Sequence, residues 1–113
     1  MNAKEYLQQV KMIDVQLDQD KDRQSKAIQT DKAKEQISRE IEKLTMIKNK
    51  IIQEIRDLHD ADYIQVLFKK YVQFKTLTIT AREMKRSYNY VLNVHKKALA
   101  AFEEAYENLR FLI

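Results

Sequence analysis

Side chains that could recognise another molecule are concentrated between residues 75 and 97. Asn89, Asn93 and Lys96 follow one another at intervals of four and three residues, so on a helix they share one face. Asn can pair with adenine edges in the DNA major groove, Tyr or Leu can touch thymine methyl groups, and Lys can neutralise a phosphate. These residue types suit nucleic-acid recognition, with a site that leans toward A·T pairs.

Positive charge is confined to the same part of the chain. The 113 residues have a formal charge of +4. Residues 69–97 carry eight basic residues against one acid, Glu83, which gives a local charge of +7. Residues 1–58 carry twelve bases and eleven acids, so the N-terminal half is nearly balanced. A localised basic segment is what a polyanionic partner requires.

Bond-making chemistry has few candidates. His59 stands beside Asp60 and Asp62, but a His and two acids at a helix break are usually a surface side chain and a cap, and no second ligand cluster completes a metal site. Cys is absent, which excludes disulfides and thiolate sites. We therefore expect no enzyme activity, no metal and no cofactor.

The absence of Gly and Pro favours long helices, and the chain is predicted to be all-α. Residues 3–27 show an apolar stripe on one helical face. Residues 31–58 show a heptad seam, with the charged residue Lys48 in one seam position. A turn over residues 27–34, with Thr30 or Asp31 as the next N-cap, would fold the two helices into an antiparallel coiled-coil hairpin. The hairpin is too thin to bury both stripes, so it should pack on the C-terminal part or on another protomer.

Residues 59–113 are predicted to form a second unit with three helices. Asp60 or Asp62 can cap a helix over residues 62–74, Thr76 a short helix to residue 84, and Ser87 a last helix over residues 88–113, about 40 Å long. This order has the layout of a helix-turn-helix followed by a long C-terminal helix.

The register that Ser87 sets for the last helix divides its side chains into two faces. Val91, Val94 and Ala98 should face inward, and the opposite face should read the DNA bases. Basic side chains around it should contact phosphates, and Thr76 and Thr78 could add contacts at a helix N-terminus. We leave open whether Tyr88 and Tyr90 contact DNA or pack, and we place His95 near a phosphate or partner. The predicted contact residues are Lys75, Thr76, Thr78, Arg82, Lys85, Arg86, Tyr88, Asn89, Leu92, Asn93, Lys96 and Lys97.

The run from Thr76 to Leu99 resembles region 4 of sigma-70-type factors and the related phage regulators of the ArpU type. The matching positions are Thr76, Ala81, Met84, Ser87, Val91, Val94, Ala98 and Leu99. The opening AKEYLQQVKMID also resembles small phage proteins that end in this module. The resemblance implies promoter or operator binding, activation of phage genes, and base reading by the residues at Tyr88, Asn89, Leu92 and Asn93.

Three departures from the family pattern limit what can be transferred. Thr80 stands where the family usually has Ile, and Lys85 replaces the common turn Gly. Lys85 therefore needs either a left-handed conformation or a longer turn. Leu92 and Asn93 replace the Arg and Gln that sigma factors often use, so their promoter preference does not carry over.

Two functional hypotheses follow from the sequence. The first is a phage-type regulator that binds double-stranded DNA in the cytoplasm, with RNA polymerase as a further partner. The second is a protein-interaction adaptor that binds RNA polymerase or another regulator through its coiled coil, without DNA. Homodimerisation and a monomer with all stripes satisfied internally both remain open. No window has the apolar length of a membrane span, so we expect no membrane partner.

Overall fold

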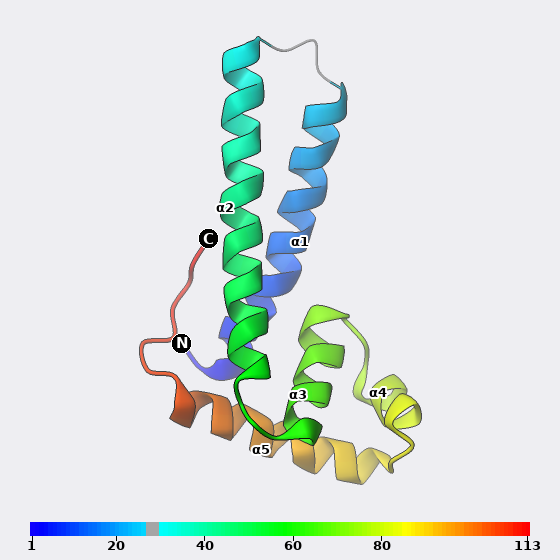
Figure 1. Ribbon diagram of the computed structural model, residues 1–113. Coiled ribbons are helices and arrows are strands. Elements are labelled where there is room, and N and C mark those ends of the chain that lie inside the picture. Colours follow the sequence, from blue (N-terminus) through cyan, green and yellow to red (C-terminus); the bar gives the residue numbers. More distant parts are fainter. Residues whose placement is uncertain (27–29) are drawn as a thin grey trace.

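The computed structural model describes residues 1–26 and 30–113. Within these ranges the chain forms only helices and connecting segments, which confirms the predicted all-α class. An antiparallel hairpin of two long helices stands on a base formed by the shorter ones, and the last helix crosses the open end of the hairpin (Figure 1). The elements are α1 (Ala3–Lys26), α2 (Asp31–Arg56), α3 (Ala61–Leu67), the π-helical turn η1 (Phe68–Val72), α4 (Leu77–Met84) and α5 (Tyr88–Ala105).

The hairpin follows the predicted stripes. The Thr30 hydroxyl accepts the Ala33 N–H at 3.3 Å and caps α2, while residues 27–29 of the predicted turn lie outside the described ranges. The Lys48 ammonium, in the charged seam position, lies 2.7 Å from the Asp14 carboxylate of α1. This half-buried ion pair bridges the two helices and fits a role in setting their register. The buried seam residues are Tyr6, Val10, Ile13 and Leu17 of α1 and Ile37, Leu44, Ile51 and Ile55 of α2.

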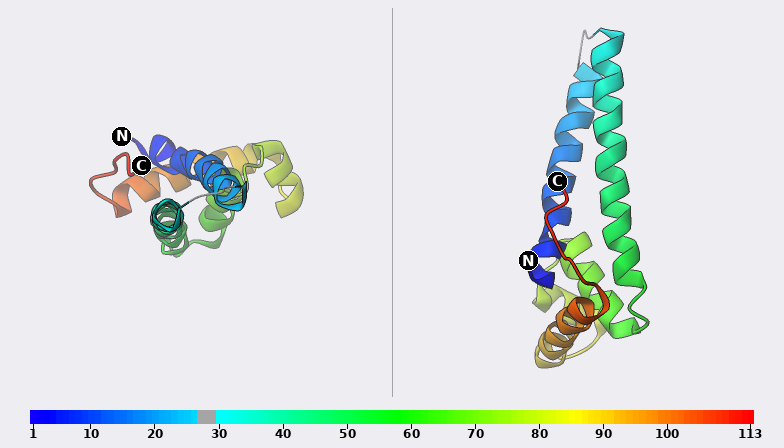
Figure 2. Two further views of the ribbon diagram at one scale, coloured as in Figure 1. Left: turned by 90° about the horizontal axis from the view of Figure 1, so that it is seen from above. Right: turned by 90° about the vertical axis from the view of Figure 1, so that its left-hand side faces the viewer.

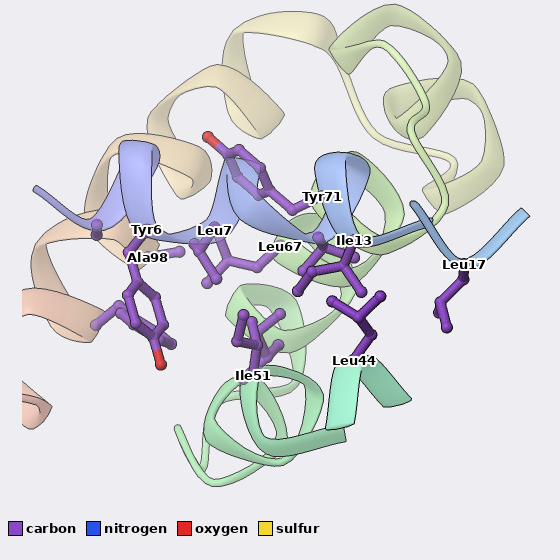
Figure 3. Packing of buried hydrophobic residues seen from close by; sticks show 13 residues of the cluster. Tyr6, Leu7, Ile13, Leu17, Leu44, Ile51, Leu67, Tyr71 and Ala98 are labelled. Carbon is purple, nitrogen blue, oxygen red and sulfur yellow. The ribbon is translucent and has the colours of Figure 1, made fainter. Parts of the chain in front are cut away.

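One hydrophobic cluster joins the hairpin to the C-terminal half. Leu7 of α1, Leu67 of α3, Tyr71 of η1 and Phe102 of α5 are all buried in it. Figure 3 shows α1 running across this cluster, with Tyr71 on one side of it and Leu44 and Ile51 of α2 on the other. Packing on the C-terminal part, one of the two expected ways to cover the hairpin stripes, is therefore present. This shared cluster therefore fixes the position of α5 relative to the hairpin.

The last helix is shorter than predicted. It ends at Ala105 instead of continuing to Ile113. Residues 106–113, which we name the C-terminal strap, turn at Asn108 (φ 61°) and run back along the hairpin (Figures 1 and 2). Leu109 and Ile113 still pack on the core, so the predicted apolar stripe is used without helical geometry.

Gln9 explains why the strap leaves the helix. Its amide lies buried among the α1 side chains, and its Nε2 donates to the Arg110 carbonyl at 3.0 Å while its Oε1 accepts the Leu112 N–H at 2.6 Å. The Tyr106 hydroxyl donates to the Glu54 carbonyl at 2.8 Å. The two Gln9 bonds satisfy the Arg110 carbonyl and the Leu112 N–H of the strap, and the Tyr106 bond satisfies a carbonyl near the end of α2.

Turns form without glycine. Among residues 1–26 and 30–113, four take positive φ values in the left-handed region: His59 (60°), Phe74 (59°), Lys85 (56°) and Asn108 (61°). Such a conformation costs a residue with a Cβ about 1–2 kcal/mol, with Asn less penalised than the others. Packing and capping on either side must hold these turns in place.

Candidate nucleic-acid interface

The connection between α4 and α5 has the geometry of a helix-turn-helix. Thr76 caps α4, with its hydroxyl accepting the Ile79 N–H at 3.2 Å. Ser87 caps α5 in the same way, accepting the Tyr90 N–H at 3.1 Å. Between them, Lys85 adopts the left-handed conformation, the first of the two alternatives that its identity had left open. The turn is three residues long, and both predicted caps are confirmed.

A second hydrogen-bond pattern closes the end of α4. The Lys85 N–H donates to the Arg82 carbonyl at 3.2 Å, and the Arg86 N–H donates to the Ala81 carbonyl at 3.0 Å. This pair of bonds is the Schellman motif, which normally uses Gly at the left-handed position. Lys85 therefore provides at some conformational cost the turn that Gly would provide without it.

A small second core fixes α5 against α3 and α4. Val66 of α3, Ala81 of α4, and Val91 and Val94 of α5 are buried together, and Tyr63, Leu77 and Met84 pack around them. Thr80, where the family pattern has Ile, is buried and donates its hydroxyl to the Thr76 carbonyl at 2.8 Å. The hydroxyl is thus satisfied, and the departure from the pattern leaves the packing intact.

The face of α5 opposite this core is open. Asn89, Asn93 and Lys96 are exposed, and Val91, Val94 and Ala98 are buried, as the Ser87 register predicts. Tyr88 is also exposed, whereas Leu92 is half-buried. The first half of α5 therefore presents two amides, a phenol and an ammonium to solvent.

Most of the predicted phosphate contacts lie exposed around this face. They are Arg82 at the end of α4, Lys85 and Arg86 in the turn, and Lys97 on α5, next to Lys96 of the open face. Thr78 is exposed in the first turn of α4, and the Thr76 hydroxyl is occupied by the cap. Within α5 itself the acidic residues are Glu103 and Glu104, in its last turn, although Asp62 of α3 accepts the Tyr90 hydroxyl in the first turn. Positive charge is therefore concentrated at the end of α5 that meets α4.

Lys75 differs from the other predicted contacts because it is paired. Its ammonium lies 2.7 Å from the Glu83 carboxylate, and Lys69 lies 2.8 Å from the same oxygen. The hydrogen bonds from Lys69 and Lys75 lower the pKa of Glu83, so the carboxylate stays charged. The cluster of Lys69, Lys75 and Glu83 keeps a net charge of +1, and Lys75 brings less positive potential to the face than its sequence position suggests.

Tyr90 is 37% exposed, but contacts with neighbouring side chains hold it in place. Its hydroxyl donates to the Asp62 carboxylate, and the Arg86 guanidinium lies 5.0 Å from the centre of its ring. The hydrogen bond to Asp62 raises the Tyr90 pKa. Asp60 accepts the Tyr63 N–H at 3.0 Å and caps α3. The two acids beside His59 thus take structural partners, one as a cap and one as an anchor for α5.

His95 was wrongly placed near a phosphate or partner. The side chain is buried, and its Nε2 lies 2.8 Å from the Tyr71 hydroxyl. Burial, with further contributions from Lys70 and Lys4, lowers the His95 pKa from 6.5 to about 4. Burial also raises the Tyr71 pKa to about 12, so both groups are neutral near pH 7. This pair was missed because nothing local in the sequence joins Tyr71 to His95.

Comparison with protein-family models, curated proteins and solved structures finds no match to this chain. Within the described ranges, none of the helices is both long enough and apolar enough to cross a lipid bilayer.

Proposed function

We propose that this protein is a regulator of transcription that binds duplex DNA through α4, the turn at residues 85–87 and the first half of α5. The observation that carries the proposal is the exposed row of Asn89, Asn93 and Lys96 on the side of α5 that faces away from the core. A helix held this way, with its N-terminal residues free, can enter a major groove. Regulation of phage genes, and activation in particular, rests on the resemblance of residues 76–99.

The charges around the row support binding to a polyanion. Five exposed basic side chains flank or belong to it: Arg82, Lys85, Arg86, Lys96 and Lys97. Contacts from such side chains give affinity and orientation without sequence information. The two amides then supply sequence preference, because bidentate pairing with adenine is worth about 1–3 kcal/mol per base pair.

The side chains beside the two amides differ in the contacts that they can make with DNA. Tyr88 stands exposed at the start of α5 and can reach a thymine methyl group. Leu92 is half-buried, so it offers a smaller apolar contact. Glu103 accepts the Ala3 N–H at 2.8 Å and ties the far end of α5 to the hairpin. DNA therefore belongs at the end of α5 near α4, away from the acidic end.

Salt dependence tests the phosphate contacts. Fluorescence anisotropy with the intact protein and a labelled random-sequence duplex should show binding that weakens steeply with salt. Each phosphate contact contributes about −0.9 to the slope of log affinity against log salt, so five contacts give about −4.5. Changing both Lys85 and Arg86 to Ala should make the slope shallower by about 2.

The matched control removes two charges elsewhere. Lys32 and Lys34 are exposed at the start of α2, at the far end of the hairpin, and the double change to Ala there should leave the slope unaltered. The proposal fails if no binding is seen at low salt, or if both double variants lose the same slope.

Sequence preference tests the two amides separately. A duplex selected from a random pool by the wild-type protein should lose about tenfold or more in affinity when Asn89 and Asn93 are both changed to Ala. Affinity for unselected duplex should not change. Equal losses on both duplexes would mean that the amides do not read bases.

A further inference from the structure

An open groove lies between α1 and the segment that joins η1 to α4. Its volume is ≈ 790 Å³. Met12 and Val15 of α1 line one side, and Tyr71 and Phe74 line the other. Its lining runs on to Thr76, the cap of α4, so the groove ends beside the proposed DNA face.

The groove exposes apolar side chains that the core does not use. Met12 is 47% exposed, Val15 50% and Phe74 42%. Met12 and Val15 are three residues apart, on the face of α1 that turns away from the buried stripe. Apolar groups gathered in a concave surface with polar ends are typical of protein interaction sites.

The backbone of Phe74, which lines this groove, has an energetically unfavourable conformation. Its backbone lies in the left-handed region, where a bulky residue is a true outlier that costs about 1 kcal/mol or more. A hydrogen bond from the Lys75 N–H to the Lys69 carbonyl, 2.9 Å long, closes the loop around it. In the free chain the ring gains only partial burial from this conformation, whereas an occupant of the groove would bury it.

The charges on the groove walls indicate the chemistry of the occupant. Lys11, Lys70 and Lys75 belong to the lining, and no lining residue is acidic. Lys75 is held by Glu83, but Lys11 and Lys70 have no ion-pair partner within the part of the chain that the structure describes. Two copies that paired symmetrically through this groove would bring the same lysines against each other, and DNA phosphates would gain nothing from the apolar floor. An acidic, apolar occupant satisfies both features.

The dimensions suit one helix. The lining on α1 runs from Gln8 to Gln19, which corresponds to about 16 Å at 1.5 Å per residue, or three helical turns. A helix that lies in a groove of this length presents apolar anchors at intervals of three and four residues. We propose that the groove binds an amphipathic helical segment of another protein, apolar on one face and acidic along its flanks. This site does not depend on the proposed DNA binding.

A designed peptide tests the site directly. The probe is a fluorescein-labelled peptide of about four turns, with Leu at the anchor positions and Glu on the flanks, and its matched partner has Lys in place of Glu. Fluorescence anisotropy with the full chain should give a dissociation constant on the order of 10–100 μM for the acidic peptide, and binding at least about tenfold weaker for the basic one.

Variants locate the binding. Met12→Glu should weaken binding of the acidic peptide by about tenfold or more, because it places a charge on the apolar floor. The matched control is Met46→Glu, since Met46 of α2 is 68% exposed and lies outside the groove lining. Lys11→Glu, at an exposed position on the groove wall, should also weaken the acidic peptide, and it keeps the test decisive if Met12→Glu fails to fold.

Three results would overturn the proposal. The first is no binding of the acidic peptide at about 500 μM protein. The dissociation constant would then be higher than a single helix is expected to show in such a groove. The second is equal binding of the acidic and basic peptides, or equal losses in the Met12→Glu and Met46→Glu variants. The third is a doubled mass in light scattering that Met12→Glu abolishes, because the occupant would then be a second copy. Unchanged DNA binding by the Met12→Glu variant would show that this site is separate from the DNA face.

Discussion

Replacement of His95 by Gln should remove a large part of the acid sensitivity of the fold. In the folded protein the imidazole is buried against Tyr71, and burial together with Lys70 and Lys4 lowers its pKa to about 4. In the unfolded chain its pKa returns to about 6.5. Between these two pKa values the unfolded state binds a proton at His95 and the folded state does not. The free energy of unfolding therefore falls as the pH falls from about 6.5 toward 4.

The size of the effect follows from the pKa difference. Each pH unit over which only the unfolded imidazole is protonated lowers the free energy of unfolding by about 1.4 kcal/mol. Between about pH 7 and pH 4.5 the wild-type protein should lose about 2.5 kcal/mol from His95 alone. Gln can keep a hydrogen bond to the Tyr71 hydroxyl but does not titrate, so the His95→Gln variant should lack this loss.

Urea unfolding followed by circular dichroism at about pH 7 and pH 4.5 measures the difference. Carboxylates also titrate in this range, so the comparison is between the pH dependence of the variant and that of the wild-type protein. His59→Gln is the control, because His59 is exposed and that variant should keep the wild-type pH dependence. Equal losses of stability in His95→Gln and the wild-type protein between the two pH values would refute the role given to His95.

Two further substitutions test the turn and the strap. Lys85→Gly should raise the free energy of unfolding by about 0.5–1 kcal/mol, because it relieves the strain of the left-handed backbone at some cost in chain entropy. The control Lys96→Gly, inside α5, should lower the free energy of unfolding by about 1 kcal/mol. Thermal melts of both variants check the pair, and a loss of stability in Lys85→Gly would contradict the assignment of strain. Gln9→Ala should cost about 1–3 kcal/mol, because it leaves the bonds to the C-terminal strap unmade, and it should speed cleavage of the strap by proteases. Exposed Gln8→Ala is its control, and equal cleavage rates in the two variants would rule out the role given to Gln9.

Local signals in the sequence predicted the helices and the register of α5. Asp60, Thr76 and Ser87 are caps because a short polar side chain can satisfy an N–H three residues ahead, whatever the rest of the fold does. Val91, Val94 and Ala98 are buried because they form the apolar face of α5, and an amphipathic helix packs that face against the core. Such features depend on neighbours within one or two turns.

Features set by distant partners could not be predicted in the same way. The apolar spacing from Phe102 to Ile113 fits a helix equally well, and the contacts that hold the strap, at Gln9 and Glu54, come from residues far away in the chain. His95 reads as an exposed residue among lysines until Tyr71 is placed beside it. The groove likewise exists only because the fold brings Met12 opposite Phe74.

The absence of glycine also constrains the order in which this chain folds. Residues with a Cβ seldom visit the left-handed region in an unfolded chain, so the turns at His59, Phe74 and Lys85 are rarely formed in advance. We therefore expect the helices and their docking to form before these turns take their native conformation. In kinetic terms, substitutions at these three positions should change the unfolding rate far more than the folding rate, with φ-values near zero.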